Sequence, residues 1–156
     1  MTKEIERKFL VKEEFKQFAT KSYKIAQGFL STVPERTVRI RIQDTKGFIT
    51  VKGLSNTSGT TRFEWEKEIP LTEAESLLAL CEPTVIEKVR YIIPANNALF
   101  FEVDEFFGEN KGLIIAEIEL PEENTLYNKP SWLGKEVTGT IKYYNSMLAK
   151  NPFNNW

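Results

Sequence analysis

Ionic side chains occupy every second position at the start of this 156-residue sequence. Glu4, Glu6 and Lys8 alternate with other residues ahead of the apolar run at 9–11. Alternate side chains of a β-strand share one face, so these three would point the same way. Six further segments place ionic residues at their polar positions: Arg39 and Arg41; Lys52; Arg62, Glu64 and Glu66; Lys88 and Arg90; Glu102 and Asp104; Glu117 and Glu119.

Many of these ionic positions are sorted by sign. The cationic groups are Arg39 with Arg41, Lys52, and Lys88 with Arg90, and the anionic groups are Glu4 with Glu6, Glu102 with Asp104, and Glu117 with Glu119. A solvated face is the ordinary explanation for one alternating strand. Solubility alone, however, does not require charges that are segregated by sign. If the sheet closes with this face inward, the charges line a channel, and its contents must neutralise them.

The two kinds of charge suit two partners. Cations from several strands suit a multivalent anion, above all a polyphosphate, through charge-assisted hydrogen bonds. Clustered carboxylates suit a hard divalent cation such as Mg²⁺ or Mn²⁺, since both prefer oxygen ligands. Both sets on one face indicate a metal-bridged polyphosphate and phosphoryl-transfer chemistry. A non-catalytic module that binds polyphosphate or nucleotide is an alternative, although its acidic positions would repel an anion unless a metal intervened.

Composition excludes several other classes of site. The chain has no histidine and one cysteine, Cys81, so a Ser-His-Asp triad, a Cys-His pair, a His-ligated zinc and an intramolecular disulfide are excluded. The Gly-rich loop of P-loop enzymes is also absent. The formal charge of -1 gives no global sign of a nucleic-acid or membrane partner, and no apolar stretch reaches the ~18 residues of a membrane span. We expect a reduced, cytoplasmic protein without either partner.

The alternation predicts eight strands, at 3–11, 23–30, 37–43, 47–53, 61–69, 85–93, 99–106 and 113–120. Helical spacing occurs at 13–19, at 72–81 with Thr72 as N-cap, and at 139–148. Short connections favour an antiparallel meander, and closure would remove its unpaired edges. We expect a single domain over residues 1–156, mainly β (α+β): an eight-stranded antiparallel closed β-barrel, with the last two helical segments covering part of its outward apolar face.

The segment Glu4-Ile5-Glu6-Arg7-Lys8 resembles the Glu-x-Glu-x-Lys signature of the CYTH superfamily, also called triphosphate tunnel metalloenzymes. The order and spacing of the later ionic segments are similar to compact bacterial members, from about residue 3 to residue 152. The resemblance implies a barrel that forms a topologically closed tunnel, and a divalent-metal-dependent enzyme that acts on a triphosphate group. It also relates the segment 132–138 to one that leads into a helix able to close a tunnel mouth, with Trp132 expected as a hydrophobic anchor.

Site residues follow from the resemblance position by position. It implies metal ligands at Glu4, Glu6, Asp104, Glu117 and Glu119. It implies a phosphate clamp formed by Lys8, Arg39, Arg41, Lys52, Arg62, Lys88 and Arg90. The candidate catalytic residues are Lys8, Lys52, Glu64 and Glu66. Arg62, Glu64 and Glu66 match a less universal part of the pattern, where they could tune the tunnel or position water. The identity of the general base stays open.

Three activities are known in this superfamily: simple triphosphatase, thiamine triphosphatase and adenylate cyclase. We favour hydrolysis of inorganic tripolyphosphate to pyrophosphate and phosphate, with magnesium or manganese as cofactor. Without histidine, the chain lacks the His-containing arginine segment of class IV cyclases, which weakens the alternative conversion of ATP to cyclic AMP and pyrophosphate. Another triphosphate-bearing small molecule stays open as substrate. The sequence leaves the oligomeric state open too, with a homodimer as one option.

Overall fold

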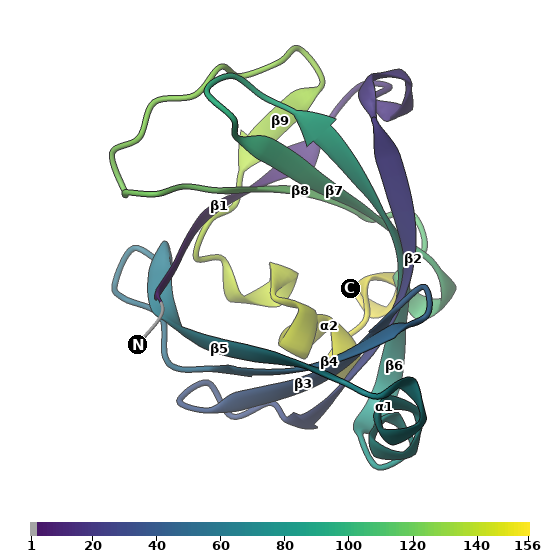
Figure 1. The fold of residues 1–156 in the computed structure, drawn as a ribbon. Coiled ribbons are helices and arrows are strands. Elements are labelled where there is room, and N and C mark those ends of the chain that lie inside the picture. The colour runs from purple at the N-terminus through teal and green to yellow at the C-terminus, as the bar shows by residue number, and fades with distance from the viewer. Residues whose placement is uncertain (1–2) are drawn as a thin grey trace.

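A closed β-barrel forms the body of the computed structural model, which describes residues 3–156 (Figure 1). The strands lie in the order β5-β4-β3-β2-β6-β7-β8-β1, and β1 pairs with β5 to close the ring. The pairings are antiparallel, so the expected eight-stranded closed barrel is confirmed. The bounds are β1 (Lys3–Val11), β2 (Lys21–Ser31), β3 (Thr37–Gln43), β4 (Lys46–Lys52), β5 (Thr61–Ile69), β6 (Glu82–Pro94), β7 (Phe100–Phe106) and β8 (Ile114–Glu119).

A ninth strand, β9 (Leu133–Glu136), was not predicted. It pairs with β1 at Phe9 and Val11, whereas β5 pairs with β1 only from Lys3 to Ile5. The strands β5 and β9 therefore pair with successive parts of β1 along one of its edges. Strand β9 has only four residues and one large apolar side chain, so it shows no alternating pattern from which a strand could be predicted.

The helical segments are shorter than expected. Helix α1 (Leu71–Leu78) follows Pro70, which is the N-cap, so the prediction of Thr72 as cap was wrong. The segment 13–19 contains only the 3₁₀ turn η1 (Lys16–Phe18). The last segment divides into η3 (Ile141–Tyr143) and α2 (Asn145–Lys150), because Tyr144 between them is extended. The remaining 3₁₀ turns are η2 (Gly108–Asn110) and η4 (Phe153–Asn155), and no helix of residues 3–156 is long and apolar enough to cross a membrane.

Apolar side chains cover the outside of the barrel, as predicted. Helix α1 lies over β3 and β4, where Ala74 approaches so closely that a Cβ at Gly47 would lie 2.5 Å from it. On the other side, Trp132 packs at 5.1 Å against the ring of Phe101 and is 2% exposed. The expectation that Trp132 is a hydrophobic anchor is confirmed. These contacts leave the inner faces of the strands free for the ionic residues.

Helix α2 lies within the outline of the barrel rather than over its outer face, so its expected role as outer cover was wrong (Figure 1). At one end of the barrel the inward-facing side chains are apolar instead of ionic. Ile86 lies there, two residues before Lys88 on the same face, and Ile115 lies two residues before Glu117. Leu148 of α2 is fully buried in this cluster, which also holds Phe29 and Phe106. The apolar cluster anchors α2 so that the residues at its start face the tunnel.

Candidate active site

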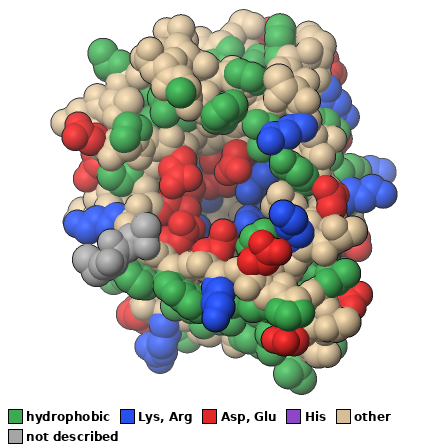
Figure 2. Space-filling model, viewed as in Figure 1, with side chains coloured by type: hydrophobic (Ala, Val, Ile, Leu, Met, Phe, Trp, Pro, Cys, Tyr) green, Lys and Arg blue, Asp and Glu red, His purple; other side chains and the backbone are tan. Residues whose placement is uncertain are grey.

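A cavity of about 190 Å³ lies inside the barrel. Figure 2 shows the hollow, with acidic side chains gathered on one side of it and basic ones on the other. The alternating strands bring nearly the whole predicted set to this cavity, because their polar positions all face inward. The predicted residues that line it are Glu4, Glu6, Lys8, Arg39, Arg41, Lys52, Arg62, Glu64, Glu66, Lys88, Arg90, Glu117 and Glu119.

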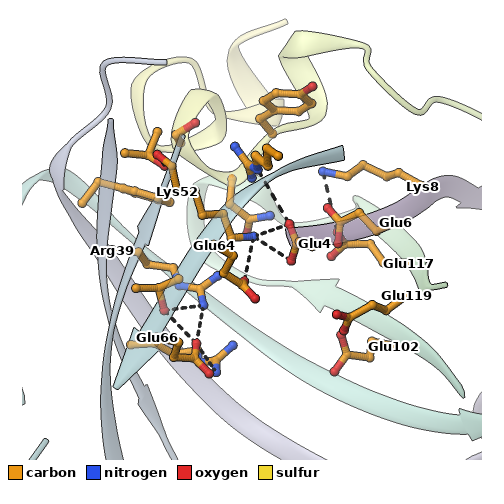
Figure 3. Close-up of a pocket in the computed structure, with 18 of the residues that line it drawn as sticks. Glu4, Glu6, Lys8, Arg39, Lys52, Glu64, Glu66, Glu102, Glu117 and Glu119 are labelled. Carbon is orange, nitrogen blue, oxygen red and sulfur yellow. Dashed lines mark hydrogen bonds and ion pairs between the residues drawn. The ribbon is translucent and has the colours of Figure 1, made fainter. Parts of the chain in front are cut away.

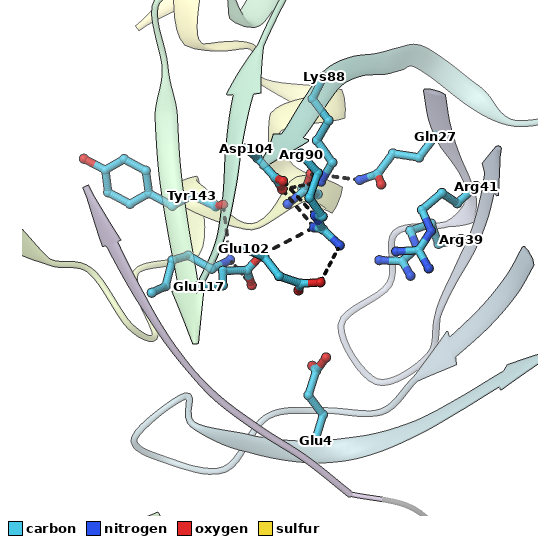
Figure 4. A network of polar contacts seen from close by, with 12 residues as sticks. Glu4, Gln27, Arg39, Arg41, Lys88, Arg90, Glu102, Asp104, Glu117 and Tyr143 are labelled. Carbon is cyan, nitrogen blue, oxygen red and sulfur yellow. Dashed lines mark hydrogen bonds and ion pairs between the residues drawn. The ribbon is translucent and has the colours of Figure 1, made fainter. Parts of the chain in front are cut away.

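Asp104 is the predicted ligand that does not line the cavity. It is 1% exposed and lies behind two cations of the clamp (Figure 4). Arg90 donates Nε and Nη2 to its two oxygens at 2.8 and 2.9 Å, and Lys88 Nζ lies 2.7 Å from Oδ2. Against the effect of burial, these charges hold the pKa of Asp104 below its usual value. The geometry gives Asp104 the task of orienting Lys88 and Arg90.

A second carboxylate orients the other half of the basic side. Glu66 Oε1 accepts hydrogen bonds from Arg39 Nη2 at 3.2 Å, Arg41 Nη2 at 3.3 Å and Thr50 Oγ1 at 2.7 Å (Figure 3). Burial, with repulsion from Arg39, lowers the pKa of Arg41 to about 10. Arg41 therefore stays charged at neutral pH. We call Arg39, Arg41, Lys88 and Arg90 the basic wall.

The acidic side is built by neighbouring strands, with Glu6 of β1 opposite Glu119 of β8 and Lys8 opposite Glu117. Burial and the charges of Glu117 and Glu4 raise the pKa of Glu6 well above its usual value. Burial and nearby carboxylates raise the pKa of Glu119 to about 7. Glu117 moves the other way despite its burial, because the charge of Lys8 and a hydrogen bond from Glu6 lower its pKa. We call Glu6, Glu117 and Glu119 the acidic wall.

Glu4 and Lys52 lie between the two walls. Lys52 Nζ donates to both oxygens of Glu4, at 2.9 and 3.0 Å, and lies 3.5 Å from Glu64. Arg62 approaches Glu4 at 3.7 Å. These cations lower the pKa of Glu4 although burial opposes them, whereas burial and the charge of Glu4 raise the pKa of Glu64. Two neighbouring carboxyls of one cavity are therefore driven toward different protonation states.

Several lining residues were missed from the sequence. Glu102 lines the cavity from the inner face of β7, where alternation had placed it beside Asp104 without indicating which of the two reaches the cavity. Tyr144, Asn145 and Ser146 enter the lining from the C-terminal segment. Asn145 accepts hydrogen bonds from Lys88 Nζ at 3.0 Å and from Gln27 at 2.8 Å. No alternation marks these three residues, because they reach the cavity through helix packing.

Comparison with known proteins agrees with this architecture. Residues 2–147 match the family model described as CYTH domain. The chain belongs to the CYTH domain family. An inorganic triphosphatase of Acetivibrio thermocellus is 48% identical and aligns with 100% of this chain and 99% of its own length. One of Nitrosomonas europaea is 35% identical over 94% of this chain and 96% of that protein.

A solved CYTH relative supports the fold as well. The crystal structure of an inorganic triphosphatase superposes with a TM-score of 0.66 at 33% identity, covering 93% of this chain and 96% of that one. Membership of the CYTH family of triphosphate tunnel metalloenzymes implies a divalent metal. The side chains that line the cavity decide which ion would bind and where.

The acidic wall fits a divalent cation by the chemistry of its donors. Its carboxylates supply the oxygen ligands that Mg²⁺ and Mn²⁺ prefer. Burial and neighbouring carboxylates raise the pKa values of Glu6 and Glu119, so negative charge there is unfavourable, and a bound cation would relieve this cost. Within residues 3–156, no three acidic, cysteine or histidine side chains are grouped closely enough to hold a metal ion. Binding would therefore need these carboxylates to draw together.

Proposed function

We propose that this protein hydrolyses inorganic tripolyphosphate to pyrophosphate and phosphate, with Mg²⁺ or Mn²⁺ as cofactor. The observation that carries the proposal is the pair of opposed walls in one cavity, cations on one side and cation-deficient carboxylates on the other. The two relatives named inorganic triphosphatase align with nearly the full length of this chain, which supports the same substrate.

The basic wall would bind the phosphate chain. Guanidinium groups match phosphate oxygens with paired, charge-assisted hydrogen bonds, and lysines add point charges. The four members of this wall are held by Asp104 and Glu66 before any substrate arrives, so little side-chain ordering is needed on binding. Lys8, Lys52 and Arg62 would extend the clamp toward the acidic wall.

The acidic wall and Glu4 would hold the metal, which when bound neutralises phosphate charge and makes a water more acidic. Asp104 is the weakest of the predicted ligands, since Lys88 and Arg90 already use both of its oxygens. Glu102 lies two residues before Asp104 on the same face of β7 and lines the cavity, so it is the better placed carboxylate of this strand. We therefore include Glu102 in the ligand set that mutagenesis should test.

The four candidate catalytic residues differ in their surroundings. Glu66 is engaged by Arg39, Arg41 and Thr50, which suits positioning rather than proton transfer. Lys8 and Lys52 have carboxylate partners at 3.9 and 2.9 Å, an ion pairing that suits the binding of phosphate oxygens rather than proton transfer. Glu64 has a raised pKa and one weak ion pair, so it is the best suited to accept a proton from water.

The test is product release by the purified protein. Tripolyphosphate or ATP is supplied with magnesium, with manganese, or with EDTA, and phosphate, pyrophosphate and cyclic AMP are measured. We expect metal-dependent phosphate release from tripolyphosphate and little reaction with ATP. Cyclic AMP from ATP would instead identify a cyclase. Tight binding of tripolyphosphate without any product would identify a binding module.

A further inference from the structure

The tunnel cavity ends at Tyr144. Two cations of the clamp lie against its ring: Lys8 Nζ is 4.9 Å and Arg62 Cζ 5.6 Å from the ring centroid. Behind the ring, Tyr144 also borders a gap of about 10 Å³ and an outer cavity of about 240 Å³. A gap of that size holds about one water molecule. This gap beside Tyr144 is therefore too small for a phosphate group unless the ring moves.

The outer cavity is also a poor place for a phosphate. Pro34, Leu54, Ile141 and Met147 form much of its wall. Among the described residues that line it, Arg62 alone carries a charge. A phosphate pushed past Tyr144 would lose hydration and gain one cation in return, which is unfavourable for a multiply charged group. Sterics and electrostatics therefore stop a phosphate chain at the same point.

The opposite end of the tunnel is open. Its lining residues Gln43, Glu102 and Glu119 also border a surface cavity of about 580 Å³, where Lys21 and Tyr23 lie. A phosphate chain that enters from this side has its leading end directed toward Lys8, Arg62 and Tyr144. The rest of a longer chain would extend through the wide mouth into solvent.

We propose that Tyr144 is an end stop that makes the enzyme act on the free end of a linear phosphate chain. The leading phosphate meets the ring, Lys8 and Arg62 neutralise it, and the length from Tyr144 to the acidic wall selects the bond that is cut. Water adds its oxygen to that phosphorus, the bridging oxygen leaves with the bonding electrons, and one proton passes to a carboxylate or solvent. Linear polyphosphates longer than three units are therefore substrates as well, whereas cyclic phosphates are not.

This inference rests on the proposed phosphohydrolase function, and it is tested with three substrates. Linear tripolyphosphate, a linear polyphosphate of defined greater length, and cyclic trimetaphosphate are given to the wild type, Tyr144→Phe and Tyr144→Ala, and the first products are resolved by phosphorus NMR. We expect the wild type to prefer the linear trimer over the cyclic one by at least about 10-fold. It should also release a product of one size from the long chain.

The two variants separate a stop from a structural role. Tyr144→Phe keeps the ring and should keep the single product, whereas Tyr144→Ala opens the gap and should give mixed, longer products from the long chain. A single unchanged product from a folded Tyr144→Ala protein overturns the end stop, and so does wild-type cleavage of trimetaphosphate at the linear rate. If the alanine variant has a strongly lowered melting temperature, Tyr144→Val serves instead, because it also removes the ring and opens the gap; it should give the same mixed products, and a single unchanged product overturns the end stop.

A failure of the proposed hydrolase function would give a different experimental result from a failure of the end stop. If the wild type cleaves none of the substrates, the hydrolase proposal fails, and calorimetric binding without metal decides the end stop. Linear tripolyphosphate should then bind at least about 10-fold more tightly than trimetaphosphate, and Tyr144→Ala should reduce that ratio. Equal affinity of the wild type for the two trimers overturns the stop.

Discussion

The basic wall and the acidic wall face one another across the same cavity, but among the described residues only in the basic wall does every side chain have an oppositely charged partner within 3.3 Å. Asp104 holds Lys88 and Arg90, and Glu66 holds Arg39 and Arg41. The acidic wall has raised pKa values at Glu6 and Glu119, and its ion pairs are longer, with Lys8 and Arg90 each 3.9 Å from Glu117. One wall is organised by the fold, whereas the other needs a cation from outside.

The largest effect is expected where the basic wall is anchored. Asp104→Ala would leave Lys88 and Arg90 buried without their carboxylate, so the free energy of unfolding should fall by about 3–5 kcal/mol. Urea denaturation measures it. Glu119→Gln, on the acidic wall, is the matched control and should be neutral or slightly stabilising. Equal losses in the two variants would contradict the difference between the walls.

The acidic wall should govern turnover instead. Glu6→Gln removes one oxygen ligand of a predicted metal site, so metal-dependent hydrolysis of tripolyphosphate should fall by at least about 100-fold while the barrel stays folded. Initial rates at several Mn²⁺ concentrations and circular dichroism check the two parts. Glu13→Gln, an exposed carboxylate outside the tunnel, should behave as wild type. Full activity in a well-folded Glu6→Gln protein would remove Glu6 from the site.

A smaller effect separates shape from charge on the basic wall. Arg41→Lys keeps the charge but removes the planar fork that contacts Glu66 and that we propose also binds a phosphate, so KM for tripolyphosphate should rise by about 10-fold with less change in kcat. Arg36→Lys, at an exposed position just before β3, is the control. An unchanged KM would mean that charge alone suffices at position 41.

The sequence was most informative where alternation along a strand decides which side chains face the cavity. Glu4, Glu6 and Lys8 reach the cavity because a closed sheet has only two faces, and alternation specifies which side chains share one. Alternation along a strand does not tell how far along the barrel a side chain lies. Glu102 and Asp104 share a face, yet one lines the cavity and the other lies behind Lys88 and Arg90.

The C-terminal segment shows a second limit. Tyr144 and Asn145 reach the tunnel because Leu148 packs into an apolar cluster formed by inward positions of distant strands. Local periodicity gives the face of a helix but not the surface that receives it. The resemblance gave a C-terminal helix able to close a tunnel mouth, but the residue that borders this end of the cavity, Tyr144, could be identified only in three dimensions.

The smallest expected effect is a pH dependence of stability that comes from the acidic wall. The pKa of Glu119 is about 7 in the folded protein, against an ordinary value of 4.5. Between these pH values the folded state binds more protons than the unfolded state, so the free energy of unfolding falls as pH rises through this window. Solvent screens this partly exposed carboxyl, which keeps the change below about 1 kcal/mol.

Glu119→Gln cannot ionise and isolates this contribution. Measured with EDTA, the stability of the variant relative to the wild type should increase from pH 4.5 to pH 7 and then stay level. A difference that is constant across this range would mean that the carboxylates of the acidic wall already have sufficient partners in the metal-free protein. Repeating the series with Mn²⁺ should shrink the difference at pH 7, because the cation supplies the charge that the acidic wall lacks. A difference that Mn²⁺ leaves unchanged would show that Glu119 lies outside the metal's reach.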